Sequence, residues 1–258
     1  MRSIWTGAIG FGLVNIPVKM YSATEAGTID FDMLDEKDHS NIHFKRVNEK
    51  TGKEVDWQQI IKGFKMPNDE YVVLSEADFE AASPKKNKTI EITDFVKESE
   101  IDSIYFEAPY YLEPDESGVR AYALLRAALL KTGKAGVATF VLRNRENLAI
   151  LRATENVIVL NRIRFEAEIR DSKELNLPPR AEIKGAELSM AISLIDQLSS
   201  KFDISKYKDT YNAELMKLIK AKAKGKEIKS PKLRIVYSKS EDLIKQLKAS
   251  LEKPKKAS

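Results

Sequence analysis

The stretch from Val137 to Phe165 constrains the fold of this chain more than any other part of the sequence. It holds three short runs rich in Val, Ile and Leu, separated by polar corners. The runs are Val137–Leu142, Leu148–Leu151 and Val157–Leu160. Apolar runs of this length, bounded by Asn and charged residues, are typical of β-strands. The stretch therefore predicts an antiparallel meander within a β-dominated core.

The same stretch carries arginine residues at its strand ends and corners. From Asn161 to Phe165 apolar and charged residues alternate, which places Arg162 and Arg164 on one face and Ile163 on the other. Guanidinium groups are rigid, bidentate donors that suit phosphate. We therefore expect one apolar face and one cationic face. The arginines concerned are Arg143, Arg145, Arg152, Arg162 and Arg164.

Positive charge is unevenly distributed along the chain, although the net charge is only +4. Residues 1–121 hold 14 Lys and Arg against 23 Asp and Glu, a net of −9. Residues 122–165 hold 8 against 2, a net of +6, and residues 215–258 hold 14 against 4, a net of +10. Such basic blocks in an acidic chain favour a polyanionic partner, or else form a solvated surface with a solubilising tail.

The N-terminal part predicts strands followed by an arm with few core residues. Strands are expected at Ile4–Thr6, Gly10–Tyr21 and Ile29–Leu34. Gly10 and Gly12 are not interpreted as a dinucleotide-binding loop. Such a loop leads into the N-terminus of a helix, whereas Pro17 keeps this segment extended. The charged segment Asp35–Lys65 is interpreted as a long hairpin around Lys50–Lys53, with strands Ile42–Val47 and Glu54–Gln58 pairing. Such an arm must pack on, or reach around, something else.

The remaining pattern predicts a mixed α and β chain. Pro109 is expected to break the aromatic strand Ser103–Leu112, whose rings are interpreted as core rather than as a base-stacking platform. The other expected strands are Glu70–Leu74 and Thr89–Val96. Helices are expected at Gly118–Lys131, Glu187–Phe202 and Tyr207–Ala223. Two short helices are also expected, one that starts at Ser75 and one that is capped by Ser240. The expected divisions are a core at 1–180, a helical subdomain at 181–224, and a basic linker, short helix and tail at 225–258.

Residues with catalytic chemistry are sparse. The chain has no cysteine, which excludes a disulfide framework and a cysteine zinc site. His39 and His43 are spaced four apart but fall in the predicted hairpin, so they are interpreted as solvated rather than as metal ligands. No cofactor or metal is expected, and a binding role is favoured over an enzymatic one. No apolar run is long enough to span a bilayer, and we expect a cytoplasmic protein with no membrane partner.

Several motifs resemble those of one family. The N-terminal run Arg2–Gly7, continued by Phe11–Lys19 and Tyr21–Glu25, closely resembles the signature of bacterial Ku, the DNA-end-binding family of non-homologous end joining. The resemblance covers essentially the whole chain in order. Later segments that agree with it are Phe44–Val47, Ile61–Phe64, Glu70–Leu74, Glu100–Asp102, Pro109–Leu112, Ala121–Arg126, Leu194–Asp196 and Lys206–Tyr211.

The resemblance implies a Ku-type β-barrel with a long bridging hairpin arm, at about 35–65, and a helical C-terminal region. It implies a homodimeric ring that threads the ends of linear double-stranded DNA and recruits and stimulates a multifunctional ATP-dependent ligase, ligase D. Two departures from the family pattern are present. Asn48 and Thr51 stand where some relatives carry a Cys-x-x-Cys pair, and the tail is shorter than a long lysine-rich extension.

Binding to DNA of any sequence requires contacts to phosphate rather than to base edges. Candidate partner-binding residues lie on the C-terminal helices, where ligase docking, dimer packing and packing on the core are all open: Tyr211, Leu215, Leu218, Leu243 and Leu247. The candidate DNA-binding residues lie on the arm and in the basic block of the core: Lys45, Arg46, Lys50, Lys53, Arg126, Lys131, Lys134, Arg143, Arg145 and Arg152.

Two other classes of function stay open at this point. One is a nucleic-acid enzyme, a nuclease or a lyase, and the other is a protein-interaction scaffold. A scaffold leaves the basic block of the core unexplained, whereas a nuclease lacks a recognisable cluster of metal ligands in the sequence.

Overall fold

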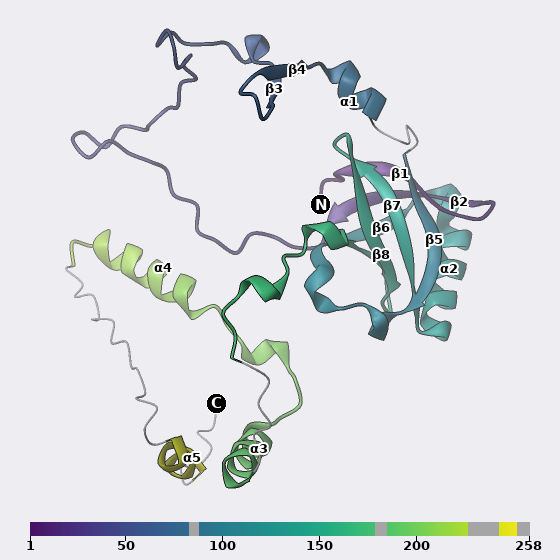
Figure 1. Ribbon diagram of the computed structural model, residues 1–258, viewed down its shortest axis with the longest axis vertical. Helices are drawn as coiled ribbons and strands as arrows, with labels where there is room; N and C mark the ends of the chain where they lie inside the picture. The colour runs from purple at the N-terminus through teal and green to yellow at the C-terminus, as the bar shows by residue number, and fades with distance from the viewer. Residues whose placement is uncertain (83–87, 179–184, 227–242, 252–258) are drawn as a thin grey trace. The chain divides into compact units, whose positions relative to one another are not determined.

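A computed structural model describes residues 1–82, 88–178, 185–226 and 243–251 of the chain (Figure 1). The chain divides into two compact units. One unit comprises residues 1–27 and 31–171, and the other comprises residues 28–30 and 172–258. The described residues contain no helix that is long and apolar enough to cross a membrane.

The first unit contains a closed seven-stranded barrel, with strand order β1-β2-β6-β9-β8-β7-β5. Parallel pairing of β1 with β5 closes the barrel, and the other neighbouring strands pair antiparallel. The predicted meander is confirmed as β7, β8 and β9. The strands are β1 (Trp5–Phe11), β2 (Val14–Ser22), β5 (Thr89–Lys97), β6 (Phe106–Pro114), β7 (Lys134–Leu142), β8 (Arg145–Ala153) and β9 (Ile158–Ile163).

Two tight turns fix the register of the hairpins. Arg143 and Asn144 both have positive φ, 53° and 61°, as a two-residue hairpin turn between β7 and β8 requires. The β1–β2 turn lies at Gly12, where φ is +58°. Gly10 is a paired residue of β1, so the predicted bend between Thr6 and Gly10 is wrong. Gly12, which has the left-handed backbone, therefore makes the turn, and Gly10 does not.

The α-helix α2 (Val119–Thr132) completes the main core. It begins at Gly118 and ends before Gly133, which has the left-handed φ of 63°, as the sequence predicted. Its Tyr122, Leu125 and Leu129 are buried in one cluster with the side chains that point into the barrel. The Tyr122 hydroxyl donates to the carbonyl of Leu112 (2.6 Å) and accepts from the amide of Ile158 (2.7 Å). It therefore ties the helix to the last register pair of β6 and β9.

Strands β7, β8 and β9 are buried on both faces. Ala135, Ile150 and Ile163 form a second cluster, against which Ile101 and Tyr105 pack. Ile158 and Leu160 belong to the main core, and Arg162 shares their side of β9 because side chains alternate along a strand. The predicted division into one apolar and one cationic face is therefore wrong: Arg162 points inward, and the outer side of β9 carries the buried residues Val159, Asn161 and Ile163.

Strand β6 continues through Pro109, so the predicted break is also wrong. Proline removes one ladder donor, and the register against β9 shifts between Phe106 and Ala108. The carbonyl of Pro109 still accepts the amide of Ala23 (3.2 Å), the residue that follows β2. The strand therefore tolerates the proline next to an irregularity in its pairing.

The arm between β2 and β5 has less regular structure than predicted. The expected strand Ile29–Leu34 is absent within the described residues 24–82, where the bridges are Leu34 to Asn41 and Val47 to Glu54. The hairpin that does form pairs β3 (Lys62–Lys65) with β4 (Tyr71–Leu74), and α1 (Glu76–Ala82) follows it. No residue from 24 to 82 is buried, so nothing holds longer strands in place.

The start of α1 agrees with the sequence. Ser75 and Asp78 exchange hydrogen bonds, with the Ser75 amide donating to the Asp78 carboxylate (2.7 Å) and the Asp78 amide donating to the Ser75 hydroxyl (3.3 Å). This reciprocal arrangement satisfies two free amides at the helix start. The 3₁₀ helices of this unit are η1 (Trp57–Gln59), η2 (Glu98–Glu100), η3 (Ser103–Tyr105), η4 (Glu116–Gly118) and η5 (Glu166–Glu168).

The second unit contains α3 (Ala186–Leu198), α4 (Thr210–Lys222) and α5 (Leu243–Leu251), with 3₁₀ helices η6 (Ser172–Glu174) and η7 (Ile204–Lys206). Helix α3 lies against α5 (Figure 1). Both predicted long helices exist but are shorter, and Asp209 caps α4 by accepting the amide of Asn212 (3.1 Å). The predicted cap Ser240 lies outside the described residues, and the division at 180 and 224 stays a prediction.

Candidate nucleic-acid interface

The cations predicted to bind DNA lie in three separate places. Four are on the arm, two are at the end of the barrel where the arm leaves, and four are toward the other end. Register pairing defines these ends: Leu142 and Ile163 belong to the first, whereas Lys134 and Ile158 belong to the second. Strand β7 separates them by about 26 Å, since nine residues rise about 3.3 Å each.

The arm cations are exposed and held by local contacts. Lys45 Nζ lies 2.7 Å from a Glu54 carboxylate oxygen, and the Arg46 guanidinium lies 4.7 Å from the centre of the Trp57 ring. Lys50 and Lys53 flank a turn in which the side chain of Asn48 accepts the Lys50 amide (3.0 Å). The contacts orient Lys45 and Arg46, while the ammonium groups of Lys50 and Lys53 stay exposed to a partner.

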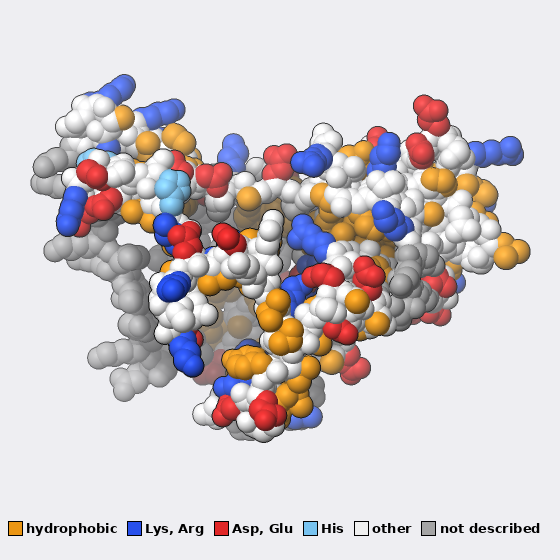
Figure 2. Space-filling view, turned by 90° about the horizontal axis from the view of Figure 1, so that it is seen from above, with side chains coloured by type: hydrophobic (Ala, Val, Ile, Leu, Met, Phe, Trp, Pro, Cys, Tyr) orange, Lys and Arg blue, Asp and Glu red, His pale blue; other side chains and the backbone are white. Residues whose placement is uncertain are grey.

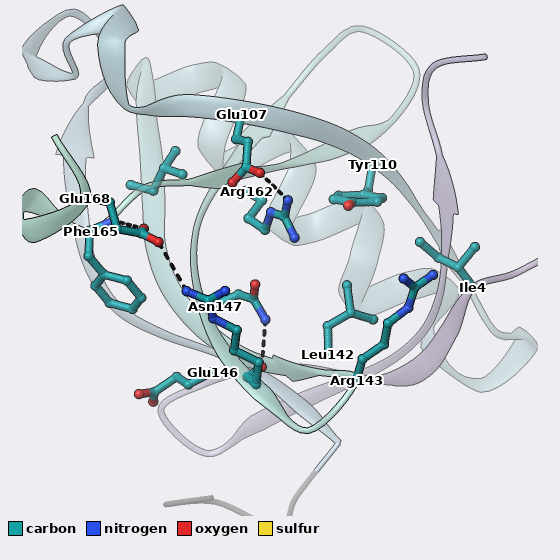
Figure 3. Close-up of a pocket in the computed structure, with 12 residues that line it drawn as sticks. Ile4, Glu107, Tyr110, Leu142, Arg143, Glu146, Asn147, Arg162, Phe165 and Glu168 are labelled. Atoms are coloured by element: carbon teal, nitrogen blue, oxygen red, sulfur yellow. Dashed lines mark hydrogen bonds and ion pairs between the residues drawn. The ribbon is translucent and has the colours of Figure 1, made fainter. Parts of the chain in front are cut away.

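The first end of the barrel, called the mouth here, gathers three arginines. Arg143 lies in the β7–β8 turn and Arg145 begins β8. Both line the cavity at this end together with Arg162, which points inward (Figure 3). Arg145 Nη2 lies 3.2 Å from a Glu168 oxygen, and Arg162 donates to Glu107. These ion pairs fix two of the guanidinium groups.

A cavity of about 420 Å³ opens at the mouth. The described residues give Arg143 no ion pair or hydrogen bond, and Figure 3 shows its guanidinium pointing toward Tyr110 and Ile4. The remaining lining includes Leu142, Asn147 and Phe165. The cavity thus combines apolar walls with a guanidinium that has no counter-charge.

The four remaining cations do not join the mouth. Arg126 donates to the carbonyl of Asn156 (2.8 Å), and Arg152 donates to the side chains of Asn161 and Glu98 (2.9 Å each). Lys131 lies in the last turn of α2, and Lys134 opens β7 opposite Lys97. Arg126 and Arg152 therefore already stabilise the barrel, which gives each a structural role of its own.

The surface view agrees with this dispersal. Figure 2 shows Lys and Arg side chains interspersed with Asp and Glu, and exposed apolar side chains between them. The exposed apolar side chains of the arm include Phe44 (79% exposed) and Trp57 (70% exposed). His39 and His43 are both exposed on the arm. The described residues contain no group of three or more His, Cys, Asp and Glu that could hold a metal ion.

The candidate partner-binding residues lie in the second unit. On α4, Tyr211 is exposed, whereas Leu215 and Leu218 are half-buried. On α5, Leu247 is half-buried, and the side chain of Leu243 lies outside what the structure describes. Helix α3 exposes a further apolar row that the sequence indicated as an amphipathic stripe but not as a docking face: Leu188, Ile192, Ile195 and Leu198.

Comparison with known proteins identifies the family. A family model described as the Ku70/Ku80 beta-barrel domain matches residues 10–190. The chain belongs to the Ku family. The non-homologous end joining protein Ku of Pseudomonas aeruginosa is 43% identical over 225 residues, which cover 86% of this chain and 77% of that protein. The protein of the same name from Archaeoglobus fulgidus is 40% identical over 256 residues, covering 98% and 99%.

Membership of the Ku family confirms the resemblance seen in the sequence, and the closed barrel with its helices confirms the predicted fold class. Among solved structures, the SPOC domain of human PHD-finger protein 3 matches with a TM-score of 0.30 and 12% identity, over 63% of this chain and 95% of that one. A likeness at that level carries no argument about function.

Sequence reasoning missed the inward-facing groups of the mouth. Glu107, Tyr110, Asn147 and Arg162 come together there from β6, β8 and β9. Parity alone gave only relative sides: Arg162 shares the side of Leu160, and Asn147 that of Ala149, and the structure shows that this side is the core.

Proposed function

We propose that this Ku-family chain binds the ends of double-stranded DNA, without regard to sequence, in the repair of double-strand breaks by non-homologous end joining. The relatives named above bear that function in their names. The observation that carries the proposal is the arm. It leaves the barrel at the mouth, the same end of the barrel that carries Arg143 and Arg145, and none of its residues from 24 to 82 is buried.

The form that binds DNA is proposed to be a homodimeric ring. Exposed apolar surface on this scale is unusual for an isolated soluble protein and indicates a covering partner. Fourteen large apolar residues of the arm are exposed, and a second copy of the chain supplies a barrel and an arm of matching composition. Two arms and two barrel mouths then enclose the duplex, and the candidate cations of the arm and of the mouth contact its phosphates.

The C-terminal unit is proposed to dock the partner ligase, ligase D, through the apolar residues of α4 and α5 named above. Tyr211 is the strongest candidate because its ring is exposed and aromatic anchors dominate many interfaces. Tyr211→Ala is expected to reduce stimulation of the ligase while leaving DNA binding intact. Lys208→Ala, a substitution of a neighbouring exposed residue, serves as the control. Equal stimulation by both variants would contradict this docking site.

A binding series tests the central proposal. Affinity is measured for a linear duplex, the same duplex closed into a circle, and a single strand, across a range of salt. Linear duplex should bind best, and six to ten phosphate contacts should weaken binding by about 10³ to 10⁵ between 50 and 200 mM salt. Equal affinity for closed circles would refute threading of an end, and cleavage of the DNA would favour an enzyme instead.

A further inference from the structure

The cavity at the barrel mouth has the size of a small-molecule site. Its volume of about 420 Å³ falls within the range of about 300–1,000 Å³ common for such sites. Its walls come from the starts and ends of several strands rather than from one loop, so the barrel holds them in fixed positions (Figure 3). The site is therefore built before any ligand arrives.

Two guanidinium groups at the cavity have donors to spare. Arg162 donates from Nη2 to Glu107, whereas its Nε is buried and has no hydrogen-bond partner among the described residues. Arg143 makes no ion pair or hydrogen bond with the part of the chain that the structure describes, and its side chain extends along the cavity. A buried donor without a partner is costly, so an acceptor bound here would relieve that cost.

The carboxylates near the cavity do not cancel this charge. Glu107 is taken by Arg162 and Glu168 by Arg145. Figure 3 shows Glu146 directed away from the other side chains of the cavity. Arg143 therefore has no counter-charge inside the cavity, and its positive charge favours an anionic ligand. Phosphate is a suitable anion because paired guanidinium groups can bind its oxygens.

The remaining walls suit a planar, partly apolar group. Tyr110 presents an aromatic ring, and Leu142 and Ile4 lie beside it. Nucleic-acid bases stack on aromatic side chains with little regard to sequence. Asn147 uses its amide nitrogen on the carbonyl of Arg145 (2.7 Å), which leaves its side-chain oxygen as an acceptor for the edge of a base.

We propose that the mouth cavity binds one unpaired nucleotide, with its phosphate at Arg143 and Arg162 and its base against Tyr110. This rests on the proposed function and identifies the part of the DNA involved, the last nucleotide of a single-stranded overhang. The root of the arm supports that placement, because the Ala23 amide bonds to Pro109, the neighbour of Tyr110. The root of the arm thus lies next to the cavity, and the proposal places the end of a duplex held by the arm there. A free nucleotide has the same chemistry and is distinguished below.

Calorimetry on the full chain tests the site itself. The probes are the four deoxynucleoside 5′-monophosphates and inorganic phosphate. Leu142→Trp fills the half-buried wall without changing charge, and Arg143→Gln removes the unpaired charge without shortening the side chain much. Each variant should weaken nucleotide binding at least tenfold, whereas Arg120→Gln, an exposed residue of α2, should not. Thermal melting of each variant verifies its fold.

Three results would overturn the proposal: no nucleotide binding by the unaltered protein, unchanged binding in folded Leu142→Trp, or inorganic phosphate binding as tightly as nucleotides. A second assay compares a blunt duplex with the same duplex bearing an overhang. A preference for the overhang that Leu142→Trp abolishes, with blunt-end binding retained, assigns the cavity to the DNA end. Nucleotide binding without such a preference overturns that assignment in favour of a free nucleotide. Failure of the unaltered protein to bind blunt duplex counts against the proposed function alone, because calorimetry is done without DNA.

Discussion

Replacing Tyr122 by Phe tests how α2 is joined to the barrel. The hydroxyl is buried and serves two backbone groups, the Leu112 carbonyl at 2.6 Å and the Ile158 amide at 2.7 Å. Both residues are fully buried, so neither group gains water when the hydroxyl is lost. Each buried group left without a partner costs about 1–3 kcal/mol. For the two groups together we therefore expect Tyr122→Phe to lower the free energy of unfolding by about 2–6 kcal/mol.

The assay follows unfolding of the barrel in urea through the fluorescence of Trp5. This residue donates from its ring nitrogen to the carbonyl of Val141 (3.0 Å), so its signal reports the barrel. Trp57, the other tryptophan of the chain, is exposed on the arm and is first replaced by Phe. Tyr21→Phe is the matched control, because it removes an exposed hydroxyl that bonds to Glu113. The reasoning is refuted if Tyr122→Phe costs no more than this control.

The remaining predictions concern pH, salt and one glycine. Burial raises the pKa of Tyr122, so the stabilising effect of its protonated hydroxyl is complete below pH 10 and is lost as the pH rises above 10. The difference in unfolding free energy between the native protein and Tyr122→Phe should therefore shrink above pH 10, as measured by the same urea titration. Lys50→Ala and Lys53→Ala should each reduce the slope of log affinity against log salt concentration by about 1, and should lower the affinity equally for all duplex sequences. An unchanged slope would show that the substituted lysine does not contact DNA. Gly133→Ala should destabilise α2 by about 1 kcal/mol because φ is 63° there, while Gly27→Ala, at the exposed start of the arm, should be nearly neutral in thermal melts.

Elements with a strong local pattern were predictable from the sequence. Strands β7, β8 and β9, and helix α2 with its stop at Gly133, follow from apolar runs, turn residues and a left-handed glycine. Each of these signals lies within about fifteen residues of the element that it describes. The resemblance to the Ku family added the barrel, which local signals alone do not specify.

The wrong predictions for the barrel concern features that are set by contacts between residues far apart in the sequence. The inner and outer faces of β9 are set by the segment containing Ile101 and Tyr105, which covers the outer side, and nothing in residues 158–163 indicates that cover. The pairing of Glu107 with Arg162 joins residues 55 apart. Alternation shows that Arg162 and Ile163 oppose one another, but only the closed barrel decides which of them faces inward.

The strands predicted for the arm are mostly absent for a different reason. They lack the buried contacts that hold strands together. None of its described side chains is buried, and the predicted ladder from Ile42 to Gln58 is reduced to the bridge between Val47 and Glu54. Two-stranded ribbons are marginal in water without a covering surface. In the proposed homodimer, ordering of the arm and assembly are therefore one step, since the second copy supplies the surface that the first lacks. Arm order then depends on protein concentration, whereas the barrel, which has its own core around Ile9, Leu112 and Leu160, does not.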